Sequence, residues 1–202
     1  EYGDVITEET PGTAVTTRGQ AIAVGENICR YYQDMGKNII TLRLDHLYGI
    51  PDCAEETRGI CARMCMEALA TGEILVDEAQ RVALLHVGDA VEFIYQVLAA
   101  STVKHSLYQI SSGEPVSERL IAETIASALN GKVTIAASPK EERREPILSN
   151  ALYKQEFGMR VFHMPQKEIA ELAGYMKKHL DEFVTIDRKP RTLLEKIRHG
   201  VN

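Results

Sequence analysis

The sequence contains no tryptophan, and aromatic residues make up only 6% of its 202 residues. It also has no apolar stretch near the roughly 20 residues that a membrane-spanning helix needs, which excludes that class of membrane protein. Basic residues are fewer than acidic residues. The formal net charge is therefore -6, which argues against nucleic acid or an anionic membrane as the main partner. The remaining composition, 45% hydrophobic and 26% charged, is that of a globular protein able to bury one core and a small satellite.

A secretory leader is also missing from the residues given. Four acidic residues, Glu1, Asp4, Glu8 and Glu9, occupy the place where a basic n-region would lie. We therefore expect a cytoplasmic protein.

The chain has few cysteines: Cys29, Cys53, Cys61 and Cys65. Cys61 and Cys65 are spaced to share one helix face, but a zinc site needs about four ligands and no second pair has matching spacing. In a reducing compartment such cysteines behave as small buried hydrophobes. We expect no metal site.

Hydrophobic periodicity predicts alternating helices and short apolar strands, which is typical of the α/β class. The predicted helices are 16–35, 57–70, 90–100, 118–129, 166–184 and 190–199, and the predicted strands are 38–44, 74–76, 82–87, 107–110 and 133–136. In the first helix we expect Ile22, Ile28 and Tyr32 to pack inward and Arg18 to point elsewhere. Asp89 is the predicted N-cap of the third helix.

Four segments, in this order and spacing, resemble one known family. They are Glu1-Tyr2-Gly3 with its acidic loop; Gly25-Glu26 to Tyr31-Tyr32, followed by Ile40–Leu44 and Tyr48-Gly49-Ile50-Pro51; Leu84–Ala90, read LLHVGDA; and Leu107–Ser117, read LYQISSGEPVS. Together they resemble the extended short-chain dehydrogenase/reductase family, the group of the nucleotide-sugar epimerases and dehydratases. The resemblance covers about residues 1–165.

The resemblance implies an α/β fold: the C-terminal part of a doubly wound Rossmann-type sheet, with a small mixed α/β substrate-binding domain. Residues 1–55 would be the remnant of the Rossmann-type domain. Residues 56–165 would form the substrate-binding part, with some segments returning to the sheet, and 166–202 would be C-terminal helices.

The family's cofactor site is only partly implied. In the family the cofactor's pyrophosphate rests on a glycine-rich turn that opens a helix, where backbone N–H groups meet the negative charge. The 14 glycines of this chain form no such turn. The resemblance therefore implies NAD in a full-length parent, none bound by this chain alone, and as partners a missing N-terminal half and a second copy in a homodimer.

The family's catalytic pair is replaced. Members use a Tyr and a Lys four residues later, the Lys lowering the pKa of the Tyr that takes a proton from the sugar hydroxyl. In the register set by Gly19 and Glu26, these positions hold Arg18 and Ile22. Neither side chain can act as that base. No catalytic residue is carried over, and Arg18 is either a phosphate or carboxylate contact or a solvated residue.

Four residues are candidates for binding. Arg143 and Arg144 match an arginine that holds the nucleotide diphosphate in the family, with Arg144 preferred, since a guanidinium fork fits phosphate oxygens. Arg81 lies one residue before the family's other arginine position, occupied here by Val82, and such an offset turns it to the opposite face unless a bulge intervenes. Tyr48 matches a residue that lines the nicotinamide and sugar end of the family's site. For each, the alternative is a solvated or packing residue.

The histidines give no pairing pattern. His86 is interpreted as a structural histidine at a strand-to-helix junction, and His46 and His163 are not assigned.

The leading hypothesis is a fragment of an NAD-dependent epimerase/dehydratase that acts on or binds a nucleotide sugar and is inactive by itself. A catalytically dead relative that serves as a binding or scaffolding module is the alternative. A reductase of a non-sugar carbonyl is a third possibility.

Overall fold

The computed structural model describes residues 5–10, 14–50, 59–130, 133–138, 146–158, 163–181 and 183. These residues form two compact units, and each unit is built from three separate segments of the chain. Unit 1 takes its described residues from 1–47, 79–117 and 141–163, and unit 2 takes them from 48–78, 118–140 and 164–202. The assignment of 1–55, 56–165 and 166–202 to three functional parts stays a prediction.

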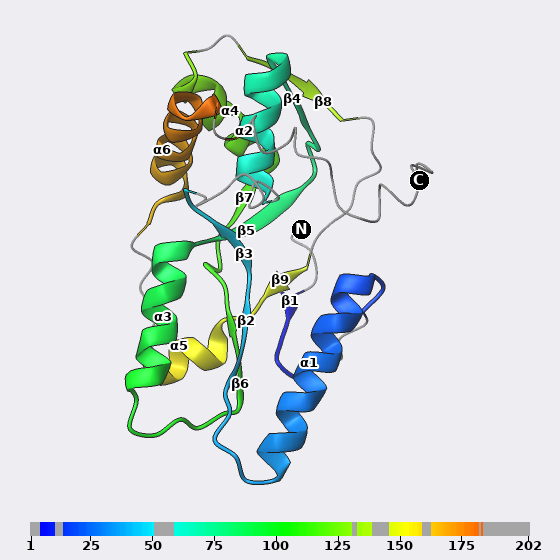
Figure 1. Ribbon diagram of the computed structural model, residues 1–202, viewed down its shortest axis with the longest axis vertical. Helices are drawn as coiled ribbons and strands as arrows, with labels where there is room; N and C mark the ends of the chain where they lie inside the picture. Colours follow the sequence, from blue (N-terminus) through cyan, green and yellow to red (C-terminus); the bar gives the residue numbers. More distant parts are fainter. Residues whose placement is uncertain are drawn as a thin grey trace, which may run out of the picture. The chain divides into compact units, whose positions relative to one another are not determined.

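Unit 1 is an α/β layer (Figure 1). Its helices are α1 (Thr17–Asp34), α3 (Val87–Ala99) and α5 (Ala151–Phe157), and its strands are β1 (Val5–Ile6), β2 (Thr41–Leu44), β5 (Arg81–His86), β6 (Leu107–Ile110), β7 (Pro115–Ser117) and β9 (Ile147–Leu148). Strand β3 (His46–Tyr48) starts in this unit. Parallel pairs join β2 to β6 and β1 to β9, and β5 lies between β3 and antiparallel β7.

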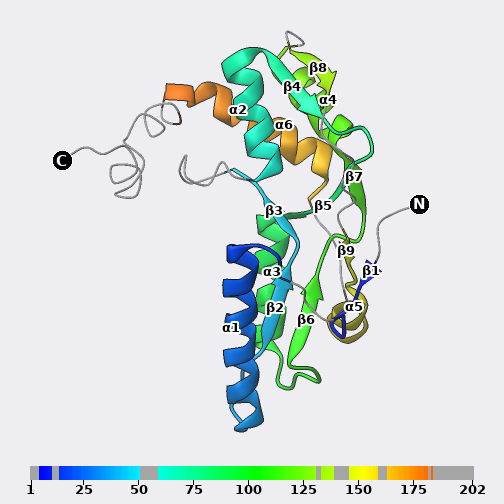
Figure 2. The same cartoon turned by 90° about the vertical axis from the view of Figure 1, so that its right-hand side faces the viewer.

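Helices α1 and α3 lie on opposite faces of the β2–β6 pair, as Figures 1 and 2 both show. In β6, Tyr108 and Ile110 point to the side of α3 and α5, so the alternation of the strand directs Gln109 to the side of α1. Leu42 and Leu44 of β2 also pack on the α3 side. Because parallel partners share a face, Arg43, which is paired with Gln109, points toward α1.

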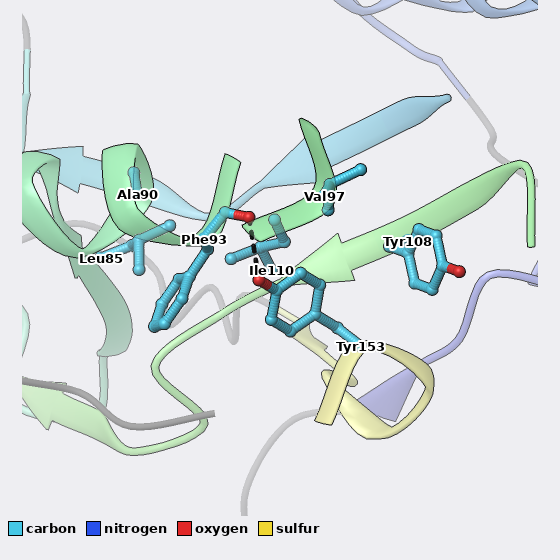
Figure 3. Packing of buried hydrophobic residues seen from close by; sticks show 7 residues of the cluster. All are labelled: Leu85, Ala90, Phe93, Val97, Tyr108, Ile110 and Tyr153. Atoms are coloured by element: carbon cyan, nitrogen blue, oxygen red, sulfur yellow. Dashed lines mark hydrogen bonds between the residues drawn. The ribbon is translucent and has the colours of Figure 1, made fainter. Parts of the chain in front are cut away.

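The core of unit 1 lies between the strands, α3 and α5 (Figure 3). Its buried members are Leu85, Ala90, Phe93, Val97, Tyr108, Ile110 and Tyr153. The Tyr153 hydroxyl donates to the Phe93 carbonyl oxygen at 2.8 Å, and the Tyr108 hydroxyl donates to Glu156 Oε2 at 2.7 Å. Burial raises the pKa of each phenol to about 12, so both remain neutral donors at ordinary pH.

Tyr153→Phe should therefore lower the free energy of unfolding by about 1 kcal/mol, the usual net value of one such hydrogen bond. Chemical denaturation followed by circular dichroism would measure the change. Tyr95→Phe is the matched control, since Tyr95 is 63% exposed on α3. Equal stability of the two variants would contradict a structural role for the Tyr153 hydroxyl.

In its described residues, unit 2 has three helices and a parallel strand pair. The helices are α2 (Ile60–Thr71), α4 (Glu118–Ala128) and α6 (Pro165–Lys178), and β4 (Glu73–Val76) pairs with β8 (Thr134–Ala137). The left-handed backbone of Gly72, with φ of 73°, ends α2 and starts β4. Ile74, Val76, Ile121, Ile125, Leu172 and Met176 are buried members of its core.

Cys61 and Cys65 are buried on α2, as expected, and burial raises the pKa of both thiols to about 12. Cys29 is half-buried, and Cys53 lies outside the described residues. Among the residues that the structure covers, no three His, Cys, Asp or Glu side chains form a group that could hold a metal ion. No described helix is both long and apolar enough to cross a membrane.

Two sequence expectations are wrong. Ile22, Ile28 and Tyr32 of α1 do not pack inward: they are 55%, 53% and 44% exposed. The residues of α1 that are half-buried are instead Gly19, Ala23, Glu26, Cys29 and Gln33, a small and polar stripe. An apolar face is buried only where another element covers it, and the β2–β6 pair presents Arg43 and Gln109 to this helix.

The second wrong expectation concerns the start of α3. Its N-cap is His86, whose Nδ1 accepts a hydrogen bond from the Gly88 N–H at 3.1 Å. Asp89 lies in the first turn and is completely buried. The helix thus begins three residues earlier than the sequence pattern indicated.

Candidate functional site

Polar side chains gather in unit 1 on the α1-facing side of β2 and β6. Arg43 forms two hydrogen bonds with Glu26 of α1: Nε donates to Oε1 at 2.8 Å and Nη2 donates to Oε2 at 2.7 Å. This hydrogen-bonded arginine holds the pKa of the Glu26 carboxyl below its ordinary value of 4.5. Glu8, in the segment before α1, accepts the Gln109 backbone N–H at 2.8 Å. The Arg43–Glu26 ion pair therefore holds α1 on the strands through charge rather than through apolar packing.

Glu26→Gln should remove a pH-dependent part of the stability. The lowered carboxyl pKa in the folded state means that this contribution is present above 4.5 and is lost as the pH falls through the folded-state pKa. We expect the unfolding free energy near neutral pH to fall by about 1.5–3 kcal/mol, the range for hydrogen bonds to charged groups.

Denaturation at several pH values between 3 and 7 would show a flatter profile for Glu26→Gln than for the wild type. The control is Glu114→Gln, which changes an exposed carboxylate just before β7. An unchanged profile in Glu26→Gln would contradict the role of this ion pair.

The carboxyl end of β2 carries a second pair. Asp45 Oδ1 lies 2.8 Å from the His46 backbone N and 3.0 Å from His46 Nδ1. The Asp45 side chain is only 6% exposed, whereas that of His46 is 48% exposed. With a proton on Nδ1, the His46 ring donates to this carboxylate.

Three buried polar atoms on these strands have no hydrogen-bond partner within the described part of the chain. They are Asp45 Oδ2 and both side-chain amide atoms of Gln109, a residue with no exposed surface. Buried polar groups are almost always paired in proteins, so such atoms commonly mark the place of a water or a ligand. Open α/β sheets bind their ligands at the carboxyl ends of the strands, which is where Asp45 and Gln109 lie.

A third polar cluster surrounds the start of α3. The His163 ring stacks on His86 with 4.0 Å between the ring centroids. Asp89 accepts from the His163 backbone N–H at 3.2 Å and lies 2.9 Å from its Nδ1. A Cβ on Gly88 would come within 2.8 Å of the His163 ring, so this stack requires glycine there.

The described structure includes two of the four predicted site residues, one in each unit. Tyr48 is buried at the end of β3, with 7% of its surface exposed, and belongs to unit 2. Arg81 is exposed at the start of β5 in unit 1, where Nη1 donates to the Gln80 carbonyl oxygen. Arg143 and Arg144 lie outside the described residues.

The bulge that would restore the family position of Arg81 is not present. Arg81, Val82 and Ala83 pair one-to-one with Ser117, Val116 and Pro115, and Val82 is buried. Arg81 therefore points to the face opposite that of Val82.

Arg18 and Ile22 lie in the first turns of α1, at the same end of unit 1 as the carboxyl end of β2 (Figures 1 and 2). Both residues are exposed. The N-terminal cap of α1 is already occupied, because Thr16 Oγ1 accepts from the Gly19 N–H at 3.0 Å.

The described start of α3 does not fit the diphosphate of a dinucleotide. Gly88 is the glycine at a strand-to-helix junction, but its N–H is bonded to His86 and the next residue is the buried Asp89. A carboxylate in the first turn of a helix repels a phosphate at that helix end. No catalytic step is derived through the cofactor from these residues.

A sequence model of the family described as "NAD dependent epimerase/dehydratase family" matches residues 2–111, which is more than half of the chain. The chain belongs to this family. The recognition made from the four segments is thereby confirmed, and the family's cofactor is NAD. No curated protein sequence matches the chain significantly.

Solved structures of such enzymes share the fold. A dTDP-glucose 4,6-dehydratase from Bacillus anthracis in complex with NAD matches with a TM-score of 0.73 and 19% identity, covering 92% of this chain and 61% of its own. A UDP-galactose 4-epimerase matches with a TM-score of 0.72 and 21% identity, covering 89% of this chain and 60% of its own. A UDP-glucuronic acid 4-epimerase from Bacillus cereus, in complex with UDP-glucuronic acid and NAD, matches with a TM-score of 0.74 and 14% identity. The match covers 88% of this chain and 59% of that structure.

These matches confirm the predicted α/β fold class with its Rossmann-type part. The chain spans about three fifths of the length of these structures. The activity of a whole epimerase or dehydratase is therefore a matter of proposal for this chain.

Sequence reasoning missed Asp45–His46 and the His163–Asp89 pair. Asp45 and His46 are adjacent in the sequence, and adjacent strand residues normally point to opposite faces, so the spacing gave no signal. His163 lies 74 residues from Asp89, and only the folded chain brings them together.

Proposed function

We propose that this chain binds a nucleotide sugar as the C-terminal part of an NAD-dependent epimerase/dehydratase, and that it does not turn the sugar over by itself. The observation that carries this proposal is the family match over residues 2–111. It is supported by the similar structure solved with UDP-glucuronic acid, and by unpaired buried polar atoms at the carboxyl ends of β2 and β6. Tyr48, Arg144, Arg143 and Arg81 remain the proposed binding residues.

Saturation-transfer NMR with UDP-glucose, UDP-glucuronic acid and dTDP-glucose would test the proposal. We expect signals from at least one of these ligands, reduced when Arg143 and Arg144 are both replaced by Ala. Lys140→Ala with Arg160→Ala removes the same charge from two other basic residues of the sequence and is the control. No signal from any of the three ligands would contradict nucleotide-sugar binding by this chain.

The alternative is a catalytically dead relative that serves as a binding or scaffolding module. Arg18 and Ile22 favour it, because they stand where the family has its Tyr and Lys. The upstream sequence of the gene would separate the two, since a glycine-rich turn after a first strand favours an enzyme. A cytoplasmic location stays a prediction.

The proposed N-terminal half has a matching surface in unit 1. Within the described residues β2 pairs only with β6, so the other edge of β2 presents backbone N–H and C=O groups without a neighbouring strand. Such an edge is a template for a further strand. We propose that a strand of the N-terminal half pairs with this edge of β2 and so continues the sheet.

A second copy of the chain is the partner that we propose for the outer face of α1. Val24, Ile28, Tyr31 and Met35 follow one another at helical spacing and are 57%, 53%, 62% and 57% exposed. Contiguous apolar patches of this kind mark protein interfaces. The polar inward stripe of α1 leaves this apolar stripe available to a symmetric partner.

Ile28→Glu should therefore shift the chain from dimer to monomer in sedimentation velocity at micromolar concentration, because it places a charge in the apolar contact. Val15→Glu is the control, as Val15 is 91% exposed and lies before α1. A wild-type chain that sediments as a monomer at these concentrations would contradict the homodimer.

A further inference from the structure

One flank of helix α3 is apolar and exposed to solvent. Val87, Val91 and Leu98 are 44%, 61% and 78% exposed. A helix turns by about 100° per residue, which places these three side chains within roughly 40° of one another around the axis. Half-buried Ile94 lies between them and the buried face of the helix. These four residues are the α3 flank, and contiguous apolar surface of this kind marks a contact site.

The α3 flank lies on the opposite side of the helix from α5. The Tyr153 hydroxyl of α5 is 2.9 Å from Gln96 Oε1, on the other side of the buried face. The same rotation per residue separates Gln96 from Val91 and Leu98 by roughly 140–160°. Helix α5 packs on β6, and Figure 2 shows it beyond β6, on the side away from β2. The α3 flank is therefore directed to the side of β2.

Strand β2 is itself incompletely covered on this face of the sheet. Leu42 and Leu44 pack on the α3 side and are only half-buried. Tyr108 and Ile110 of β6, on the same face, have no exposed surface. Within the described residues β2 pairs with β6 alone, so its outer edge has no neighbouring strand. The free strand edge and the exposed apolar surface thus lie on the same side of unit 1.

We propose that the α3 flank, together with Leu42 and Leu44, is the docking surface for a helix of the N-terminal half, the half whose strand pairs with the free edge of β2. The proposal rests on the proposed function, which makes this chain the C-terminal part of a larger fold. One strand–helix unit covers the strand edge and the apolar surface together, since helices pack on the faces of parallel sheets.

The similar solved structures support this occupant. The matches cover 61%, 60% and 59% of their length, so about two fifths of each fold lies outside the part that this chain resembles. The α3 flank carries no polar side-chain atom, so the helix that covers it needs an apolar stripe of its own. The apolar stripe of α1 is on the other face of the β2–β6 pair (Figures 1 and 2), so a second copy bound there leaves the α3 flank accessible.

The first test compares this chain with the longer chain that includes the upstream half. Hydroxyl-radical footprinting read by mass spectrometry measures how fast individual side chains are oxidised. We expect oxidation of Val91 and Leu98 to be slower by about fivefold or more in the longer chain, because a close-packed helix excludes water from them. Leu75, which is 45% exposed on β4 of unit 2, is the internal control and should keep its rate.

Hydrogen exchange of the β2 amides in the same two chains separates the ways in which this can fail. Protected β2 amides with unchanged oxidation of Val91 and Leu98 overturn the present proposal and leave the proposed function intact. If neither measurement changes, or if the gene encodes no upstream strand–helix segment, the proposed N-terminal half falls together with its docking surface.

The second test places a charge on the α3 flank. Val91→Glu should lower the Tm of the longer chain by about 5 °C more than the Tm of this chain, because only the longer chain would bury the unpaired charge. Ala99→Glu is the matched control: it adds the same charge at an exposed position of α3 outside the flank and should change the two Tm values equally. An equal Tm shift of Val91→Glu in both chains would overturn the proposal.

Discussion

Calorimetric titration of NAD or NADH into this chain should show no measurable affinity. Dinucleotide-binding proteins place the pyrophosphate on backbone N–H groups of a glycine-rich turn at a helix N-terminus, and this chain has no such turn. The glycine that comes nearest in position, Gly88, has its N–H bonded to His86 and is followed by the buried Asp89. The chain should therefore lose essentially all of the affinity that a complete family member has.

A family member that contains a glycine-rich turn is the positive control, titrated at the same concentration and temperature. Micromolar binding of NAD by this chain would contradict the prediction. It would show that the cofactor uses contacts other than the phosphate cradle.

Restoring the family's catalytic pair should give the largest change in rate. In a longer chain that supplies a dinucleotide-binding half, Arg18→Tyr with Ile22→Lys should raise turnover by about 10²- to 10⁴-fold, the usual contribution of a general base. The two substitutions should act as a unit, so either one alone should give much less than the pair. Nicotinamide absorbance with a panel of nucleotide sugars would measure the rates.

Asn27→Lys in place of Ile22→Lys is the matched control, since it puts a lysine at another exposed position of α1 that is outside the apolar stripe. If Arg18→Tyr with Asn27→Lys raises turnover as much as the restored pair, the register that places Arg18 and Ile22 at the Tyr and Lys positions is wrong. An unmodified longer chain that turns over at about 1 to 10³ per second would contradict the catalytically dead alternative.

The exposure of Ile22 bears on this experiment. A lysine at position 22 would not have to be buried, because Ile22 is 55% exposed within the described structure. The substitution should therefore be tolerated by the fold, so a failure to raise turnover would count against the register. This advantage was not foreseen from the sequence, where Ile22 was expected to pack inward.

The sequence by itself determined the long elements and the family. The apolar periodicity of 16–35 and 118–129 and the short apolar runs at 107–110 and 133–136 correspond to α1, α4, β6 and β8, with no end shifted by more than one residue. Local periodicity suffices to place these elements because an apolar stripe or run repeats regularly along each of them, although in α1 that stripe is not buried. The motifs in residues 2–111 were specific enough to identify the family.

Only the tertiary structure decided which faces are buried and which polar groups meet. Sequence periodicity says that α1 has an apolar side, but the strands present Arg43 and Gln109 to this helix, so a salt bridge to Glu26 lies inside and the apolar stripe lies outside. His163 reaches Asp89 across 74 residues, and the Asp45 carboxylate turns back to the neighbouring His46. These contacts depend on where distant segments and side-chain rotamers bring their atoms, and neither composition nor spacing along the chain encodes that information locally.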